Sequence, residues 1–384
     1  MRYRWLGTTG LYVSEIGFGA WAIGGSMWGP QDDFYSRQAL HQALNMGCNF
    51  IDTALAYGNG HSERLIASVL QERGERAIIA TKVRPKNLNW NNSVGTPLED
   101  VFSAESIQDQ VETSLRNLKT ECIDVLQLHT WNREWNDQCS SVLKTIAELK
   151  QAGKIRAFGI SLKDKEPNAA NELIQWRQVD VLQVFFNLLY QEPISKLFPI
   201  LKKYKIGMIA RVPLAFGALS GRFNAQTIFL GDDHRKNLYR GSSLQETLLK
   251  VKKLQFLAAS SKSMAETAIQ WTLAYPEVST TIPGIRNLRQ AIDNCKAGEL
   301  PPLKDSWVRK AEKLYNNNFG RPIQTIDSTA AIHAVFMSGF KLRASKKHKS
   351  AKIKTRSSKI KKTVKRKRVV KIHKKKGSIK KKHK

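Results

Sequence analysis

The feature that most constrains the fold of this chain is a regular alternation of short apolar runs with helical patterns. Eight runs have the composition of β-strands, and a helical pattern follows each of them. The runs cover residues 15–20, 49–54, 77–83, 124–130, 157–162, 181–187, 207–214 and 279–284. Several are apolar throughout, as expected of strands that are covered on both faces. The alternation predicts a parallel α/β sheet, and eight units over about 300 residues favour a closed (β/α)8 TIM barrel.

An open, doubly wound sheet is the structural alternative to a barrel. Such a sheet usually carries a G-x-G-x-x-G turn after its first strand. The segment GFGAWAIGG at residues 17–25 is rich in glycine but lacks that spacing. We therefore favour the barrel.

Polar side chains stand at the ends of the predicted strands. In a (β/α)8 barrel the catalytic groups lie at the carboxyl ends of the strands. The strand ends here carry Asp52, Lys82, His129, Ser161, Asn187 and Arg211. Each of these residues alone is more simply explained as a strand cap or an ion-pair partner. Together, at one end of a barrel, they favour catalysis.

Five motifs resemble those of the aldo-keto reductases. They are DTALAYGNGHSE, ATKV, DVLQLH, GKIRAFGIS and TTIPGIRNLRQAIDN, and they occur in the family's order over roughly residues 1–320. The first and the last are fairly specific, whereas ATKV or LQLH alone is a weak signal. The resemblance implies a (β/α)8 barrel that reduces aldehydes or ketones with a nicotinamide cofactor.

By this resemblance Asp52, Tyr57, Lys82 and His129 match the family's catalytic tetrad. Reduction of a carbonyl needs a proton for the developing alkoxide, and a tyrosine hydroxyl can donate it although its ordinary pKa is about 10. We expect the Lys82 ammonium to lower the pKa of Tyr57 and the Asp52 carboxylate to keep a buried Lys82 charged. His129 is expected to donate a hydrogen bond to the substrate carbonyl.

The hydride must come from a cofactor, because no side chain supplies one. The resemblance implies NADP(H), lying across the barrel mouth. The residues that match the family's cofactor-binding positions are Ser161, Gln183, Arg211, Arg286, Gln290 and Asn294. Ser161 and Gln183 match positions that hold the nicotinamide carboxamide. Arg286 is expected to face the 2′-phosphate, because a guanidinium and a helix N-terminus both favour an anion.

One residue departs from the family pattern. Leu162 follows the sequence GIS, where the family usually has asparagine. One hydrogen bond to the carboxamide is then missing, and we expect weaker or slower use of the cofactor without loss of the reaction. Trp21 and Trp131 are expected walls of the substrate pocket, with core packing as the alternative for both.

The last part of the chain differs in composition from the rest. Residues 341–384 contain 23 of the 63 Lys and Arg residues and no Asp or Glu, which leaves residues 1–340 with a net charge of +8. We predict a barrel domain over 1–320, an apolar connecting segment over 321–340 and a disordered basic tail over 341–384. Such a tail is expected to bind nucleic acid or other polyanions non-specifically. The alternative is a solubilising appendage without a partner.

Further features bound the location and the class of the protein. The four cysteines are widely spaced, so we expect reduced thiols and neither a disulfide framework nor a metal site. No window approaches the roughly 20 apolar residues of a membrane span, and we expect a cytoplasmic protein, with nucleoid or nuclear association possible through the tail.

The alternative function is a polyanion-associated protein whose reductase-like body acts as a slow redox-sensing module. Loop composition does not identify the substrate.

Overall fold

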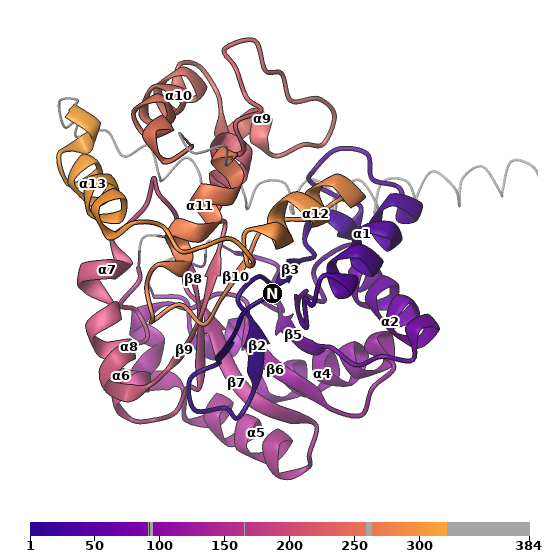
Figure 1. Cartoon of the computed structure of the whole chain (residues 1–384). Coiled ribbons are helices and arrows are strands. Elements are labelled where there is room, and N and C mark those ends of the chain that lie inside the picture. Colours follow the sequence, from indigo (N-terminus) through magenta and orange to yellow (C-terminus); the bar gives the residue numbers. More distant parts are fainter. Residues whose placement is uncertain (91, 93–94, 165, 259–262, 321–384) are drawn as a thin grey trace, which may run out of the picture. The chain divides into compact units, whose positions relative to one another are not determined.

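The predicted strands form one parallel sheet. The computed structural model describes residues 1–320 apart from 91, 93–94, 165 and 259–262. Within that part of the chain, eight strands follow one another in sequence order around the sheet, and each pairs in parallel with the next (Figure 1). The strands are β3 (Phe18–Gly19), β4 (Phe50–Asp52), β5 (Ile78–Val83), β6 (Ile123–Leu128), β7 (Ile155–Ser161), β8 (Val181–Phe185), β9 (Gly207–Arg211) and β10 (Thr280–Ile282).

The sheet closes on itself where its first strand meets its last. The backbone N–H of Gly17 donates to the carbonyl of Thr281 at 2.8 Å, and that of Gly19 donates to Pro283 at 3.1 Å. A Cβ atom on Gly19 would lie 2.7 Å from the carbonyl oxygens of Ile282 and Pro283. Only glycine allows this close approach of two backbones, so the glycine-rich segment of the sequence serves barrel closure.

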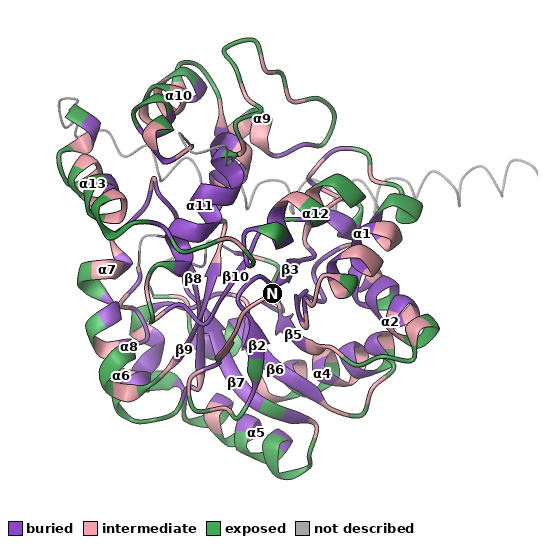
Figure 2. Ribbon diagram, viewed as in Figure 1, coloured by how far each residue is buried: buried purple, intermediate pink, exposed green. Residues whose placement is uncertain are grey.

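Helices form the outer layer. Those that follow strands are α1 (Asp33–Asn45), α2 (His61–Arg73), α4 (Ala104–Leu118), α5 (Ser140–Gln151), α6 (Asn171–Gln175), α8 (Phe198–Tyr204), α11 (Met264–Leu273) and α12 (Leu288–Lys296). Five more are α3 (Leu98–Val101), α7 (Pro193–Lys196), α9 (Arg235–Leu238), α10 (Ser243–Lys253) and α13 (Asp305–Asn316). Figure 2 shows buried residues along the strands and exposed residues on the outer faces of the helices. This separation is expected of amphipathic helices around a sheet that is buried on both faces.

The barrel interior has an apolar layer and a hairpin that covers one end of it. Side chains from seven strands, among them Phe50, Val125 and Ile209, pack together inside the barrel. The hairpin of β1 (Tyr3–Trp5) and β2 (Tyr12–Ser14) adds Leu6, Leu11 and Val13 to the same cluster. Its turn lies against the first residue of β9, because a Cβ on Gly7 would be 2.3 Å from the amide nitrogen of Gly207. The hairpin therefore closes the amino end of the barrel.

The predicted (β/α)8 TIM barrel is confirmed, and the strands are shorter than the apolar runs that predicted them. The run 15–20 contributes only Phe18–Gly19 as a strand, and the run 279–284 contributes Thr280–Ile282. Outside these strands, Ile16 and Gly284 form the bridges to Thr281 and Gly19 that help to close the barrel. The predicted connecting segment 321–340 and the predicted tail 341–384 lie outside the described residues.

Candidate active site

A buried ion pair lies inside the barrel, at the carboxyl ends of β4 and β5. The Lys82 ammonium donates to both carboxylate oxygens of Asp52 at 2.8 Å and to the carbonyl of Thr53 at 2.7 Å. Both side chains are almost completely removed from solvent. Burial lowers the pKa of Lys82 below its ordinary value, and the charge of Asp52 opposes that shift. The expected pairing of Asp52 with Lys82 is therefore present.

Tyr57 lies beside this ion pair, on the loop between β4 and α2. The Lys82 Nζ is 5.2 Å from the centre of the tyrosine ring. The loop turns through Gly58, which has a φ of 64°, and a Cβ there would lie only 2.1 Å from the carbonyl oxygen of Gly24. An alanine at position 58 would have a strained backbone, and its Cβ would clash with Gly24, so this turn requires glycine. The turn places Tyr57 beside the ion pair.

His129 completes the cluster from the end of β6. Its ring centroid is 5.7 Å from that of Tyr57 and 4.7 Å from that of Trp90, and the His129 and Trp90 rings are nearly perpendicular. Burial lowers the pKa of His129 well below its ordinary value, and the charges of Lys82 and Arg211 lower it further. The imidazole is therefore neutral at physiological pH. Its Nδ1 is buried and has no hydrogen-bond partner among the described residues.

The electrostatics of Tyr57 differ from the expectation. We expected Lys82 to lower the pKa of Tyr57, but burial raises that pKa well above its ordinary value and the charge of Asp52 raises it further, while Arg211 opposes both. The physical reason is that burial disfavours the charged phenolate, and the Asp52 carboxylate offsets part of the attraction of the Lys82 ammonium with which it is in contact. The phenol stays protonated, as a proton donor must be.

Three residues predicted to bind the nicotinamide lie on the neighbouring strands β7, β8 and β9. Ser161 and Gln183 are register partners on β7 and β8, and Arg211 ends β9. The Arg211 guanidinium donates to the carbonyl of Leu162 at 3.0 Å, pairs with Asp164 and lies 5.3 Å from the centre of the Phe185 ring. The Leu162 side chain, which departs from the family pattern, is buried in the core.

The Gln183 side chain has a partner that the sequence did not indicate. Its Nε2 donates to Asp52 Oδ1 at 2.6 Å. The predicted carboxamide site is thus in direct contact with the buried ion pair.

The predicted phosphate-binding residues lie between β10 and the first turns of α12. The Arg286 guanidinium donates to the carbonyls of Trp28 at 2.9 Å and Pro30 at 2.7 Å, and to the Gln31 side chain at 2.9 Å. Its backbone N–H donates to Oε1 of the Gln290 side chain at 2.8 Å. All these acceptors of Arg286 are uncharged.

Asn294 and the two tryptophans occupy different environments. Asn294 is buried on α12, and its Nδ2 donates to the carbonyl of Gly284 at 3.4 Å. The Trp21 ring is stacked on Tyr57 at 6.3 Å, at the site. The Trp131 indole is buried and donates to Asn136 at 2.9 Å. The contacts of Trp131 are those of core packing, the alternative that the sequence left open.

Sequence reasoning missed several residues around this cluster. His234 lies 4.9 Å from Trp21 and 4.7 Å from Trp28, and its Nδ1 is 2.7 Å from the carbonyl oxygen of Met27. Burial lowers the pKa of His234 to about 4, so this imidazole is neutral too. His234 lies in the long connection between β9 and α11, and Trp90 lies in the loop that follows β5. No spacing rule predicts which loop residue reaches the site.

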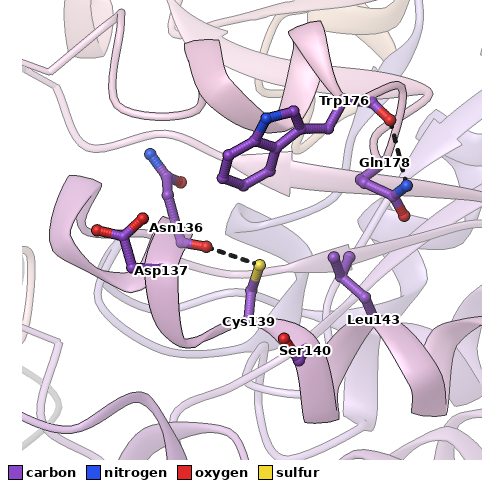
Figure 3. A pocket seen from close by; sticks show the side chains of 7 residues that line it. All are labelled: Asn136, Asp137, Cys139, Ser140, Leu143, Trp176 and Gln178. Carbon is purple, nitrogen blue, oxygen red and sulfur yellow. Dashed lines mark hydrogen bonds between the residues drawn. The ribbon is translucent and has the colours of Figure 1, made fainter.

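A separate hollow of about 490 Å³ lies on the outer layer, beside the start of α5. Figure 3 shows the half-exposed Trp176 above it, together with Asn136 and Cys139. The Cys139 thiol donates to the carbonyl of Asn136 at 2.9 Å, and burial raises the pKa of that thiol. A protonated, buried thiol is a poor nucleophile, so Cys139 does not mark this hollow as a catalytic site.

Residues 15–316 match the family described as the aldo/keto reductase family. The chain belongs to this family. The reductase is 32% identical over 323 residues to the aldo-keto reductase YhdN of Bacillus subtilis (strain 168), with 81% of this chain and 91% of that protein covered. It is thus an oxidoreductase that acts on small carbonyl compounds, in a family that works with NAD(P)H.

Solved structures agree with this assignment. The glycerol dehydrogenase AKR11B4 from Gluconobacter oxydans has a TM-score of 0.70 at 28% identity, covering 85% of the reductase and 98% of that chain. The holo form of the aldo-keto reductase AKR11C1 from Bacillus halodurans has a TM-score of 0.65 at 28% identity, covering 82% and 96%. Among the described residues of the reductase, every helix is too short or too polar to span a bilayer.

Proposed function

We propose that this reductase converts an aldehyde or ketone to an alcohol with NADPH, and that Tyr57 is the proton donor. The observation that carries this proposal is the cluster at the carboxyl ends of β4, β5 and β6. There a protonated phenol, a neutral imidazole and a buried Asp52–Lys82 pair lie within a few ångströms of one another. Proton donors and hydrogen-bond donors held in a water-poor site are what stabilises a developing alkoxide.

Each residue has a distinct part in the proposed reaction. The Tyr57 hydroxyl gives its proton to the alkoxide oxygen. The Lys82 ammonium, held in place by Asp52, stabilises the phenolate that remains. His129 is neutral, so one ring nitrogen carries a proton and can donate it in a hydrogen bond that aligns the substrate carbonyl. The Trp21 ring, stacked on Tyr57, forms an apolar wall beside the reacting group.

The residues at the strand ends fit a nicotinamide dinucleotide phosphate. Ser161 and Gln183 are register partners, and Arg211 ends the next strand opposite Phe185. The Nε of Arg211 is buried without a hydrogen-bond partner among the described residues. Arg286 carries a positive charge whose recorded hydrogen-bond acceptors are all uncharged, which suits a 2′-phosphate. Gln290 and Asn294 follow on α12 toward the adenosine end. When bound, such a cofactor supplies the hydride.

The test of the cofactor is a fluorescence titration of the full-length protein with NADPH and with NADH, repeated for Arg286→Ala. We expect the dissociation constant for NADPH to rise by about 10- to 100-fold in the variant, because a charge-assisted hydrogen bond to phosphate is lost. The dissociation constant for NADH should stay within about a factor of three, since NADH has no 2′-phosphate.

Arg289→Ala is the matched control for this titration. Arg289 lies on the same helix, is exposed and pairs with Asp293 at 3.1 Å, so its loss should leave NADPH affinity unchanged. If Arg286→Ala and Arg289→Ala weakened NADPH binding equally, the cause would be the general loss of positive charge and not a specific contact. Equal weakening of NADPH and NADH by Arg286→Ala would contradict a phosphate contact.

The alternative function of a redox-sensing, polyanion-associated protein depends on residues 341–384, which lie outside the described residues. Neither the described residues nor the relatives support it. Polyanion binding by the tail therefore stays a prediction from composition.

A further inference from the structure

Gln183 is in contact with the buried ion pair from the opposite side of the barrel. It lies on β8, four strands away from β4 in either direction around the closed sheet, and it donates to Asp52 Oδ1 at 2.6 Å across the interior. Both side chains are buried. Asp52 therefore accepts hydrogen bonds from Lys82 and from Gln183, and two opposite strands meet at one carboxylate.

This contact fixes the orientation of the Gln183 amide. A carboxylate oxygen only accepts hydrogen bonds, so the NH₂ group of the amide must face Asp52. The carbonyl oxygen Oε1 is then directed away from the carboxylate and has no hydrogen bond to any described residue. That free acceptor stands beside Ser161, the register partner of Gln183. It suits a ligand that offers an N–H, as the carboxamide of a nicotinamide does.

We propose that Gln183 is a positioning residue that couples the carboxamide site to the Asp52–Lys82 pair, and through that pair to Tyr57. The proposal rests on the function proposed above. A carboxamide N–H donating to Oε1 polarises the amide and strengthens the hydrogen bond that its NH₂ group makes to Asp52. The Asp52 charge acting on Tyr57 is then smaller with the cofactor bound than without it. The Gln183 side chain thus binds the cofactor and, when the cofactor is bound, reduces the effect of the Asp52 charge on the pKa of Tyr57.

Other charged and titratable groups around the pair do not replace this link. His129 and Arg211 face it from the ends of β6 and β9, and the charge of Arg211 lowers the pKa of Tyr57. Glu63 on α2 is buried and accepts hydrogen bonds from Thr81 at 2.7 Å and Asn117 at 2.8 Å. Among the recorded hydrogen bonds of the described residues, only those from Lys82 and Gln183 reach the Asp52 carboxylate.

The test compares Gln183→Met with Ser161→Ala in the full-length protein. Each variant removes one proposed contact with the carboxamide, so we expect the NADPH dissociation constant to rise by about tenfold in both. Only Gln183→Met also removes the donor to Asp52. With more of the Asp52 charge uncompensated, Tyr57 holds its proton more tightly. The alkaline limb of the kcat profile at saturating NADPH should therefore move up by about one pH unit in Gln183→Met and stay in place in Ser161→Ala.

A second measurement needs no turnover. In the nucleotide-free protein, Gln183→Met should lower the urea midpoint because a buried carboxylate loses a donor, whereas Ser161→Ala should change it little. A Gln183→Asn variant, whose amide is one methylene shorter, should behave like Gln183→Met if reach to Asp52 matters.

The outcomes separate this coupling from the proposed function. If wild-type protein binds NADPH but both variants have the wild-type pH profile, Gln183 only holds the carboxamide and the coupling is wrong. If wild-type protein binds neither nucleotide, the proposed function fails and the coupling fails with it. A urea midpoint that is unchanged in Gln183→Met would show that the amide does not stabilise Asp52.

Discussion

Tyr57→Phe is expected to lower kcat by about 10²- to 10⁴-fold, the range attributed to a positioned general acid. The substitution removes one oxygen atom and leaves the aromatic contacts with Trp21 and His129 in place. The dissociation constant for NADPH should therefore stay within about a factor of three. The measurement is the reduction of a panel of aldehydes and ketones, followed by nucleotide absorbance, beside a nucleotide titration of the same preparation.

Trp176→Phe serves as the control for this experiment. Trp176 is half-exposed at the end of α6 and lines the hollow beside the start of α5, so its substitution tests for non-specific effects of changing an aromatic residue. Retention of more than about a tenth of wild-type kcat by Tyr57→Phe would rule out Tyr57 as the proton donor. Loss of nucleotide binding in the same variant would instead indicate a structural change.

Lys82→Met is expected to have the largest effect on stability. It removes the ammonium from a pair whose carboxylate stays buried, and breaking a buried pair in this way typically costs about 3–5 kcal/mol of unfolding free energy. Turnover should fall as well, because the phenolate left by Tyr57 has no neighbouring cation from β5. Urea denaturation followed by circular dichroism measures the first effect, and carbonyl reduction measures the second.

The double variant Lys82→Met/Asp52→Leu separates charge from packing. Replacement of both members by apolar residues removes the uncompensated charge, so most of the lost stability should return while turnover stays low. Gln183 then lacks its acceptor, which limits the recovery. A double variant no more stable than Lys82→Met would show that the volume of Lys82, and not the charge of Asp52, determines the loss.

The sequence predicted the barrel because its strands and helices are local patterns. Eight apolar runs, each followed by a helical pattern, specify eight strands, and the order of those runs is the order of β3 to β10 around the sheet. Asp52 and Lys82 were predictable for the same reason, since each ends a strand and neighbouring parallel strands bring their carboxyl ends together. The family resemblance added Tyr57, which lies on a loop whose conformation no periodicity describes.

Contacts that cross the barrel were not predictable. Gln183 meets Asp52 over a separation of 131 residues, and Arg286 is held by carbonyls of a loop 255–258 residues earlier in the chain. Such pairs depend on the radius of the closed sheet and on loop conformations. The raised pKa of Tyr57 was not predicted, because the sequence shows neither the burial of the phenol nor the 2.8 Å contact between Lys82 and Asp52.

The N-terminal hairpin has a kinetic consequence. Because Leu6, Leu11 and Val13 close the amino end of the barrel, the polar layer at the strand ends can be reached only through the opposite mouth. A dinucleotide and a carbonyl compound that both bind there must share that entrance. A nucleotide seated on Ser161 and Gln183 would form the floor on which the carbonyl rests, so it would have to arrive before the carbonyl and depart after the alcohol.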